Sequence, residues 1–258
     1  NPDYTINSCA TSRCFFGQFN MESELMQDQN IRKAVEMGID KEGFCSVIMQ
    51  GRGVPAKAAF PSSFSYGNDA VETVSYDPDG AKKLLEDSGW TDGDGYVDKD
   101  GEKLSINWLT YPTRLEQPKL AEYAQATLKD IGIDVQVNNT SDHRTFAENG
   151  DFDVYVSSTT TAPTGDSEYF FTSTVVGSKN YGKYQNDEVT KLTEKLHQTF
   201  DKDERGKLAV ELQQDILDDD AFFFVSHLNM GIVTKSNVKG MAAHPCDYYE
   251  ITAELDVE

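Results

Sequence analysis

Asp166 is the residue whose neighbours best suit it to bind a charged group. It stands in the segment TTAPTGDSEYFF, where Pro163 restricts the backbone and Gly165 permits an unusual turn. The carboxylate can therefore be directed into a cleft. A carboxylate that loses water there gains more from a cation than one on an open surface. The alternative is that Asp166 only caps a helix starting at Ser167, and one residue could do both.

Arg114, in TYPTRLEQPKL, is the second candidate for a binding residue. It lies between an expected strand end and an expected helix start, where ligands collect in α/β sheets. Its planar fork suits a carboxylate or a phosphate. The alternative is a surface arginine beside Glu116. Four more side chains are candidates for rim or orienting contacts, although aromatic residues at such places also serve in packing: Tyr111, Thr160, Thr161 and Tyr181.

No pattern for catalysis or metal binding accompanies these residues. In DGDGYVDKDGEK, position 12 of a calcium loop counted from Asp92 is Lys103 instead of glutamate, so a hairpin is expected. The four histidines have no metal-ligand spacing, and no serine lies in a Gly-x-Ser-x-Gly context. We expect no enzyme activity, no metal and no cofactor. The hypothesis from a different class, a hydrolase with an acidic cleft, requires two carboxylates with separated pKa values in one pocket.

Composition limits the partners that this chain can have. Of its 258 residues, 38% are hydrophobic, enough for a substantial core, and the net charge is −21. An acidic surface repels phosphate backbones and anionic membranes, so nucleic acid is not an expected partner. No apolar run approaches the roughly 20 residues that span a bilayer. The first residues do not read as a signal peptide, so we expect any export signal to lie outside this chain.

The elements that must position the candidate residues alternate between strands and helices, which indicates an α/β fold. In Tyr76–Trp90 the helix signals are complete: Asp77 suits the cap, Pro78 the first turn and Gly89 the end. Periodicity and caps predict further elements: strands at 4–9 and 14–20 around a turn at 10–13, strands at 104–109, 133–137, 152–157, 221–226 and 230–234, and helices at 115–131, 141–149 capped by Ser141, 189–200 and 201–216 capped by Asp201.

Several segments, taken together and in order, resemble the extracytoplasmic solute-binding proteins of peptide and nickel ABC importers, known as family 5. The segments are Tyr76–Trp90 with Leu120–Val137, Phe16–Phe44, Asp92–Ile106, Phe152–Phe171, Asn180–Val189 and Phe224–Gly240. The resemblance implies a periplasmic-binding-protein-like (type II) lobe, with a mixed sheet flanked by helices. Residues 1–258 would form a single lobe, the second of two, and residues 221–258 would return toward an N-terminal lobe that this chain lacks.

The resemblance also implies a function. The chain would belong to the substrate-binding component of an ABC importer, which captures a peptide by closure of two lobes and docks on a membrane permease. Asp166 would accept the α-ammonium group of the peptide, and Arg114 would neutralise its other end. A nickel chelate or an opine-like solute is the alternative ligand. The position at which nickel-binding relatives carry a histidine is Phe200 here, which argues against nickel ligation by histidine in this lobe.

Two further expectations concern the setting of the chain. The protein would be extracytoplasmic, in the periplasm or at the cell surface, and anchored to lipid through a segment absent here. A sensor or a chaperone could use the same fold without feeding a transporter.

Because half of the contacts would be missing, we expect calorimetry on this lobe alone to show little or no affinity for peptide, whereas the two-lobed protein binds. Tight binding by the lobe alone would contradict this.

Overall fold

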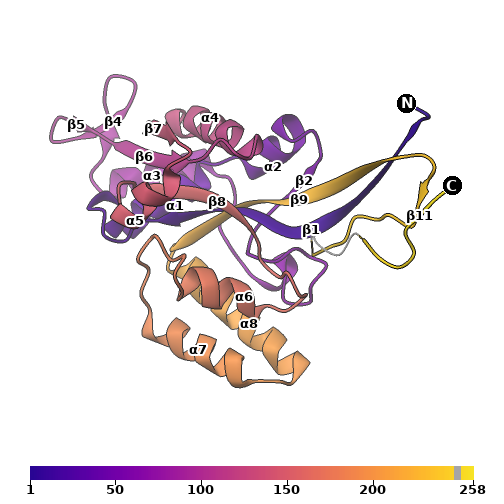
Figure 1. Ribbon diagram of the computed structural model, residues 1–258. Helices are drawn as coiled ribbons and strands as arrows, with labels where there is room; N and C mark the ends of the chain where they lie inside the picture. Colours follow the sequence, from indigo (N-terminus) through magenta and orange to yellow (C-terminus); the bar gives the residue numbers. More distant parts are fainter. Residues whose placement is uncertain (247–250) are drawn as a thin grey trace.

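A mixed sheet of six strands forms the centre of the computed structural model, which describes residues 1–246 and 251–258 (Figure 1). The strand order is β2-β9-β1-β8-β6-β7. Strand β6 runs parallel to β7 and β8, whereas β1 is antiparallel to β8 and β9. The six strands are β1 (Tyr4–Phe19), β2 (Gly53–Pro55), β6 (Ser105–Thr110), β7 (Asp134–Asn139), β8 (Val154–Thr160) and β9 (Phe222–Lys235). The predicted α/β class with a mixed sheet is confirmed.

Helices cover both faces of this sheet (Figure 1). They are α1 (Gln29–Met37), α2 (Lys41–Gly43), α3 (Pro78–Asp87), α4 (Glu116–Lys129), α5 (His143–Asn149), α6 (Glu168–Phe170), α7 (Asp187–Gln198) and α8 (Lys202–Asp218). Short helical turns lie at 25–27, 44–48, 68–70 and 171–175. Two small sheets join β3 (Thr91–Asp92), β4 (Val97–Lys99) and β5 (Glu102–Lys103), and β10 (Val238–Lys239) with β11 (Asp256–Val257). Among the described residues, no helix combines the length and the apolar character needed to cross a bilayer.

The aromatic residues of β1 and β9 divide between two cores because successive side chains of a strand point to opposite faces. Phe15 and Phe223 belong to the core beneath α1, α3 and α4. Phe16, Phe222 and Phe224 belong to the other core, which α6, α7 and α8 cover. The central strands are therefore buried on both sides.

The local signals of α3 and α8 behave as the sequence predicts. The Asp77 carboxylate accepts a hydrogen bond from the Gly80 N–H at 2.9 Å, Pro78 is the first residue of α3, and Gly89 has a φ of +86°. Asp201 caps α8 in the same way. The prediction for Ser141 is wrong, because α5 begins at His143 and residue 142 occupies the cap position.

Strands β1 and β9 are continuous where the sequence predicts interruptions. Ala10 pairs with Asn229 and Cys14 with His227, so residues 11–13 of β1 face the single residue Leu228. The expected turn is thus a β-bulge, which adds residues without reversing the chain. The Thr11 hydroxyl donates to the Leu228 carbonyl at 2.8 Å and holds the two strands together there. Beyond the bulge the strands leave the sheet as a two-stranded ribbon, with the chain ends near its tip (Figure 1).

Gly17 is required where β1 passes the Phe223 ring. A Cβ at Gly17 would lie 2.1 Å from ring carbons of Phe223, whereas a Cβ at Gly231 on β9 would meet nothing nearer than 3.8 Å. We expect Gly17→Ala to lower the free energy of unfolding by about 1–3 kcal/mol through overpacking. Chemical denaturation measures the change. The control Gly231→Ala should change stability by about 0.5 kcal/mol or less, and equal effects of the two substitutions would contradict this account.

Candidate functional site

A cavity of about 430 Å³ opens at the carboxyl ends of the parallel strands. Tyr111 directly follows β6, His143 begins α5 after β7, and residues 157–159 come from the end of β8. Ligands of open α/β sheets bind at this edge because loops diverge there and leave a crevice. The lining residues are Phe16, Gln18, Tyr111, His143, Arg144, Glu148, Tyr155, Ser157, Ser158, Thr159, Thr174, Ser178, Lys179 and Tyr181.

Four rings in mutual contact form the aromatic wall of this cavity. The His143 ring stacks on Tyr111 with centroids 4.2 Å apart, and its Nδ1 lies 2.7 Å from the Tyr155 hydroxyl. Tyr181 meets Tyr155 edge to face at 5.5 Å. Burial raises the pKa of Tyr155 well above its ordinary value, so the phenol stays protonated. The wall is a rigid surface of rings and neutral polar groups.

Gln18, buried in β1, fixes the loop that carries Tyr181. Its side-chain amide donates to the Lys179 carbonyl at 3.1 Å and accepts from the Gly182 N–H at 3.2 Å. The loop lies so close to the strand that a Cβ at Gly182 would come within 2.4 Å of the Phe19 carbonyl oxygen. Gln18 is therefore a positioning residue for one side of the cavity.

The structure brings together two of the six predicted site residues, Tyr111 and Tyr181, in this cavity. Arg114 lies half-buried in the turn before α4, outside the lining, and its side chain makes no hydrogen bond to another described residue. Thr160 and Thr161 are buried at the end of β8. The Thr161 hydroxyl donates to the Ser12 carbonyl at 2.9 Å, so this side chain supports the bulge. A ligand contact of these three residues stays a prediction.

Asp166 lies in a different cavity, of about 570 Å³, beside α7 and α8. Its carboxylate accepts hydrogen bonds from the Glu168 N–H at 2.8 Å and from Arg205, at 2.6 Å to Nη2 and 3.0 Å to Nε. The capping role that was the alternative for Asp166 is met in part: its carboxylate binds an N–H in the first turn of α6, but the cap position of that helix is Ser167. Its contact with a ligand stays a prediction, and the Arg205 guanidinium already neutralises this carboxylate.

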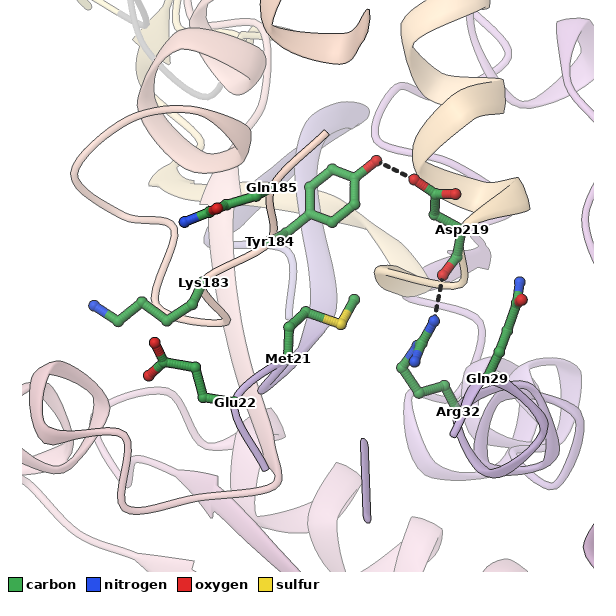
Figure 2. Close-up of a pocket in the computed structure, with 8 residues that line it drawn as sticks. All are labelled: Met21, Glu22, Gln29, Arg32, Lys183, Tyr184, Gln185 and Asp219. Carbon is green, nitrogen blue, oxygen red and sulfur yellow. Dashed lines mark hydrogen bonds between the residues drawn. The ribbon is translucent and has the colours of Figure 1, made fainter. Parts of the chain in front are cut away.

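A third cavity, of about 410 Å³, lies between α1 and α8, and its polar groups are largely occupied (Figure 2). The Arg32 guanidinium donates to the carbonyls of Met26, Asp219 and Asp220. The Asp219 carboxylate accepts from the Tyr184 hydroxyl at 2.5 Å. These contacts join helix ends to loops, so we interpret this cavity as a structural junction.

The cavities do not fit an acidic hydrolase. Glu148 is the only carboxylate among the described residues that line the aromatic cavity. In the cavity of Asp166, burial acts to raise the pKa values of Asp166 and Glu168, but hydrogen bonds from Arg205, together with one from His197 to Glu168, hold both pKa values below the ordinary range. A catalytic acid and base need pKa values that are moved apart. Among the described residues, no group of three or more His, Cys, Asp or Glu side chains could hold a metal ion.

Sequence reasoning missed His143, Tyr155 and Gln18. The four histidines were judged only by their spacing as metal ligands, which does not test for a single histidine next to a strand end. The available signal was the position of His143 just after the strand parallel to 104–109. Tyr155 and Gln18 carry no signal, because they lie inside strands.

The fold, a mixed sheet flanked by helices with a cavity at its edge, is that of the periplasmic-binding-protein-like solute-binding proteins. Residues 1–182 match the family described as bacterial extracellular solute-binding proteins, family 5 middle. The chain belongs to this family, whose members are binding proteins for transport and not enzymes.

Individual relatives agree with this assignment. The oligopeptide-binding protein AppA of Bacillus subtilis is 29% identical over 95% of this chain and 47% of its own length. The nickel-binding protein NikA of Staphylococcus aureus is 26% identical over 89% of the chain and 46% of its own length. The structure of AppA with a nonapeptide has a TM-score of 0.82 at 25% identity, covering 95% of this chain and 50% of AppA. The chain spans about half the length of the curated relatives it matches.

The pair of Asp166 and Arg205 gives a prediction that separates a structural role from ligand binding. Because the folded state lowers the pKa of Asp166, its contribution to stability is present above the unfolded pKa and is lost as the pH falls through the folded pKa. The carboxylate is partly exposed, so we expect Asp166→Asn to cost about 1 kcal/mol at pH 7 and less at pH 2. Denaturation at both pH values measures this.

Ligand affinity provides the second readout for the same variant. If Asp166 only stabilises the fold, through Arg205 and the first turn of α6, the affinity of the variant for its ligand should stay within about twofold of that of the parent protein. Distant sites that are not coupled behave in this way. A loss of binding without a change in stability would instead favour the ligand role.

Proposed function

We propose that this chain is the ligand-binding lobe of the substrate-binding component of an ABC importer, and that it captures a peptide or a related small polar solute. The observation that carries the proposal is the cavity at the carboxyl ends of β6 and β8, where Tyr111, Tyr155 and Tyr181 present rings beside polar groups. A cavity with apolar walls and a few convergent polar groups is the common form of a small-ligand site. The similarity to AppA, an oligopeptide-binding protein, supports a peptide as the first choice.

The mechanism in this proposal is closure of two lobes around the solute, followed by docking on a membrane permease. The ribbon of β1 and β9 supports a contact with another lobe, because it extends away from the rest of the sheet (Figure 1). Tyr4, Ile6 and Val233 on this ribbon are exposed by half or more, as expected of a surface that another part of the protein covers. The protein would act outside the cytoplasm as a periplasmic protein or a lipoprotein of the cell surface.

Arg114 keeps a place in this proposal. It lies where the chain leaves the carboxyl end of β6, close in sequence to Tyr111, and no described residue pairs with its guanidinium. When the lobes close, it could neutralise a carboxylate at the rim of the site. The ammonium contact proposed for Asp166 has less support, because that carboxylate is bound to Arg205 in another cavity.

A nickel chelate or an opine-like solute is the second candidate ligand. Two observations favour it: the similarity to the nickel-binding protein NikA, and an imidazole, His143, in the wall of the cavity. Native mass spectrometry of the full-length protein, purified with any bound solute, distinguishes the candidates by mass. A peptide or a chelate would support solute binding, and an empty protein that takes up neither oligopeptides nor nickel with L-histidine would contradict it.

Tyr181 tests whether the aromatic cavity is the binding site. We expect Tyr181→Ala to weaken the binding of tetraalanine to the full-length protein by about tenfold or more, because an aromatic wall is lost. Isothermal titration calorimetry measures the change. Tyr96→Ala, in the small sheet of β3 to β5 and outside the cavity, is the matched control and should leave the affinity unchanged. If both variants bind tetraalanine as tightly as the parent protein does, the solute is bound elsewhere.

A further inference from the structure

His143 stands in the wall of the aromatic cavity with one of its two ring nitrogens engaged. Its Nδ1 lies 2.7 Å from the Tyr155 hydroxyl, and the described residues offer no hydrogen bond to Nε2. The ring is held in place by stacking on Tyr111. One polar atom of a positioned side chain is therefore left for a molecule in the cavity.

The hydrogen bonds around Tyr155 determine which nitrogen carries the proton. Among the described residues, His143 Nδ1 is the group that lies within hydrogen-bond distance of the Tyr155 hydroxyl, and it is therefore the acceptor for the Tyr155 proton. If Nδ1 donated instead, the Tyr155 proton would have no described acceptor. Tyr155 therefore donates to Nδ1 of His143, which leaves the proton of the neutral ring on Nε2.

The neutral form is the one present at pH 7. Burial, and the charge of Arg144 beside it, lower the pKa of His143 below its ordinary value. Nε2–H is then a donor that no described residue uses.

The charges nearby also suit an acceptor with negative charge. Arg144 and Lys179 line the cavity and Glu148 is the only carboxylate of the lining, in a chain whose net charge is −21. The Arg144 side chain forms no hydrogen bond or ion pair with another described residue. Two cations against one anion make this a locally positive place on an acidic protein.

We propose that His143 is a specificity-determining residue whose Nε2–H donates a hydrogen bond to a carboxylate of the bound solute, with Tyr155 as a positioning residue. This inference rests on the proposed function, since it assumes that the aromatic cavity binds the solute. It assigns the end of a peptide that the cavity recognises, the carboxyl end. It also predicts that a ligand without an oxyanion loses this contact and leaves Nε2–H without an acceptor, which is costly in a partly buried site.

NMR spectroscopy on the protein labelled with ¹⁵N-histidine tests, without any ligand, which group donates in the hydrogen bond between Tyr155 and His143. Long-range ¹H–¹⁵N correlations should show the Nε2–H tautomer for His143, identified by the signal that disappears in His143→Gln. Tyr155→Phe removes the donor to Nδ1, and we expect the tautomers of His143 to become mixed in that variant. An Nδ1–H tautomer in the parent protein would overturn the proposal, because Nε2 would then offer a lone pair instead of a proton.

Calorimetry on the full-length protein tests the contact itself, with tetraalanine and tetraalanine amide as the probes. We expect the free acid to bind about tenfold or more tightly than the amide, as expected for a hydrogen bond to a charged group. His143→Leu should reduce this preference to about twofold, whereas His143→Gln should keep most of it, because its amide N–H can replace Nε2–H. His197→Leu, in the cavity of Asp166, is the control that should not change the preference.

The outcomes separate this inference from the proposed function. If acid and amide bind the parent protein equally, His143 does not recognise a carboxylate, although peptide binding stands. If neither probe binds and nickel with L-histidine binds in a manner that His143→Leu abolishes, the imidazole is a metal ligand, and both the peptide reading and this inference fail.

Discussion

The pairing of β1 with β9 in the middle of the sheet is the constraint on which the rest of the structure depends. These strands lie more than 200 residues apart in sequence, from Tyr4↔Lys235 to Gln18↔Phe222, and each buries aromatic side chains on both faces. One core lies on each face, so a slip of the register by one residue would exchange the side chains of the two cores. The close fit of Gly17 against the Phe223 ring fixes that register.

The position of the cavity follows from this arrangement. Strand β1 pairs with β8 on its other edge, and β8 is followed in the sheet by β6 and β7, which run parallel. The buried Asp153 carboxylate joins the start of β8 to its neighbours, accepting from the Asn107 N–H at 2.7 Å and from the Ser23 hydroxyl at 2.5 Å. The carboxyl ends of β6 and β8 therefore lie at the same edge of the sheet. Gln18 then places the loop of Tyr181 against it, so five parts of the chain share one site.

Most of the elements and part of the site could be predicted from the sequence. Features set by neighbouring residues were predictable, whereas features set by distant parts of the chain were not. Helix α3 was predictable to within a residue or two because Asp77, Pro78 and Gly89 act on their own neighbours. The bulge opposite Leu228 was not, because it depends on a strand more than 200 residues away.

The same distinction holds for the candidate site. Tyr111 was found because it follows an expected strand end, whereas the partner of Asp166 is Arg205, 39 residues further along, on another helix. Local chemistry can be read from a sequence, but the partner of a charge is set by the fold.

The arginines show how the fold divides structural charges from available ones. Arg32 donates to three carbonyls and Arg205 binds two carboxylates, so both guanidiniums are engaged within the fold. Arg114 and Arg144, in contrast, have no hydrogen bond or ion pair with another described residue, although the chain carries 44 acidic residues. These two follow the carboxyl ends of the parallel strands β6 and β7. Arg32, Arg52 and Arg205, unlike these two, each donate to a described residue. The position of two available guanidiniums at one sheet edge supports the proposal that an anionic group of a solute binds there.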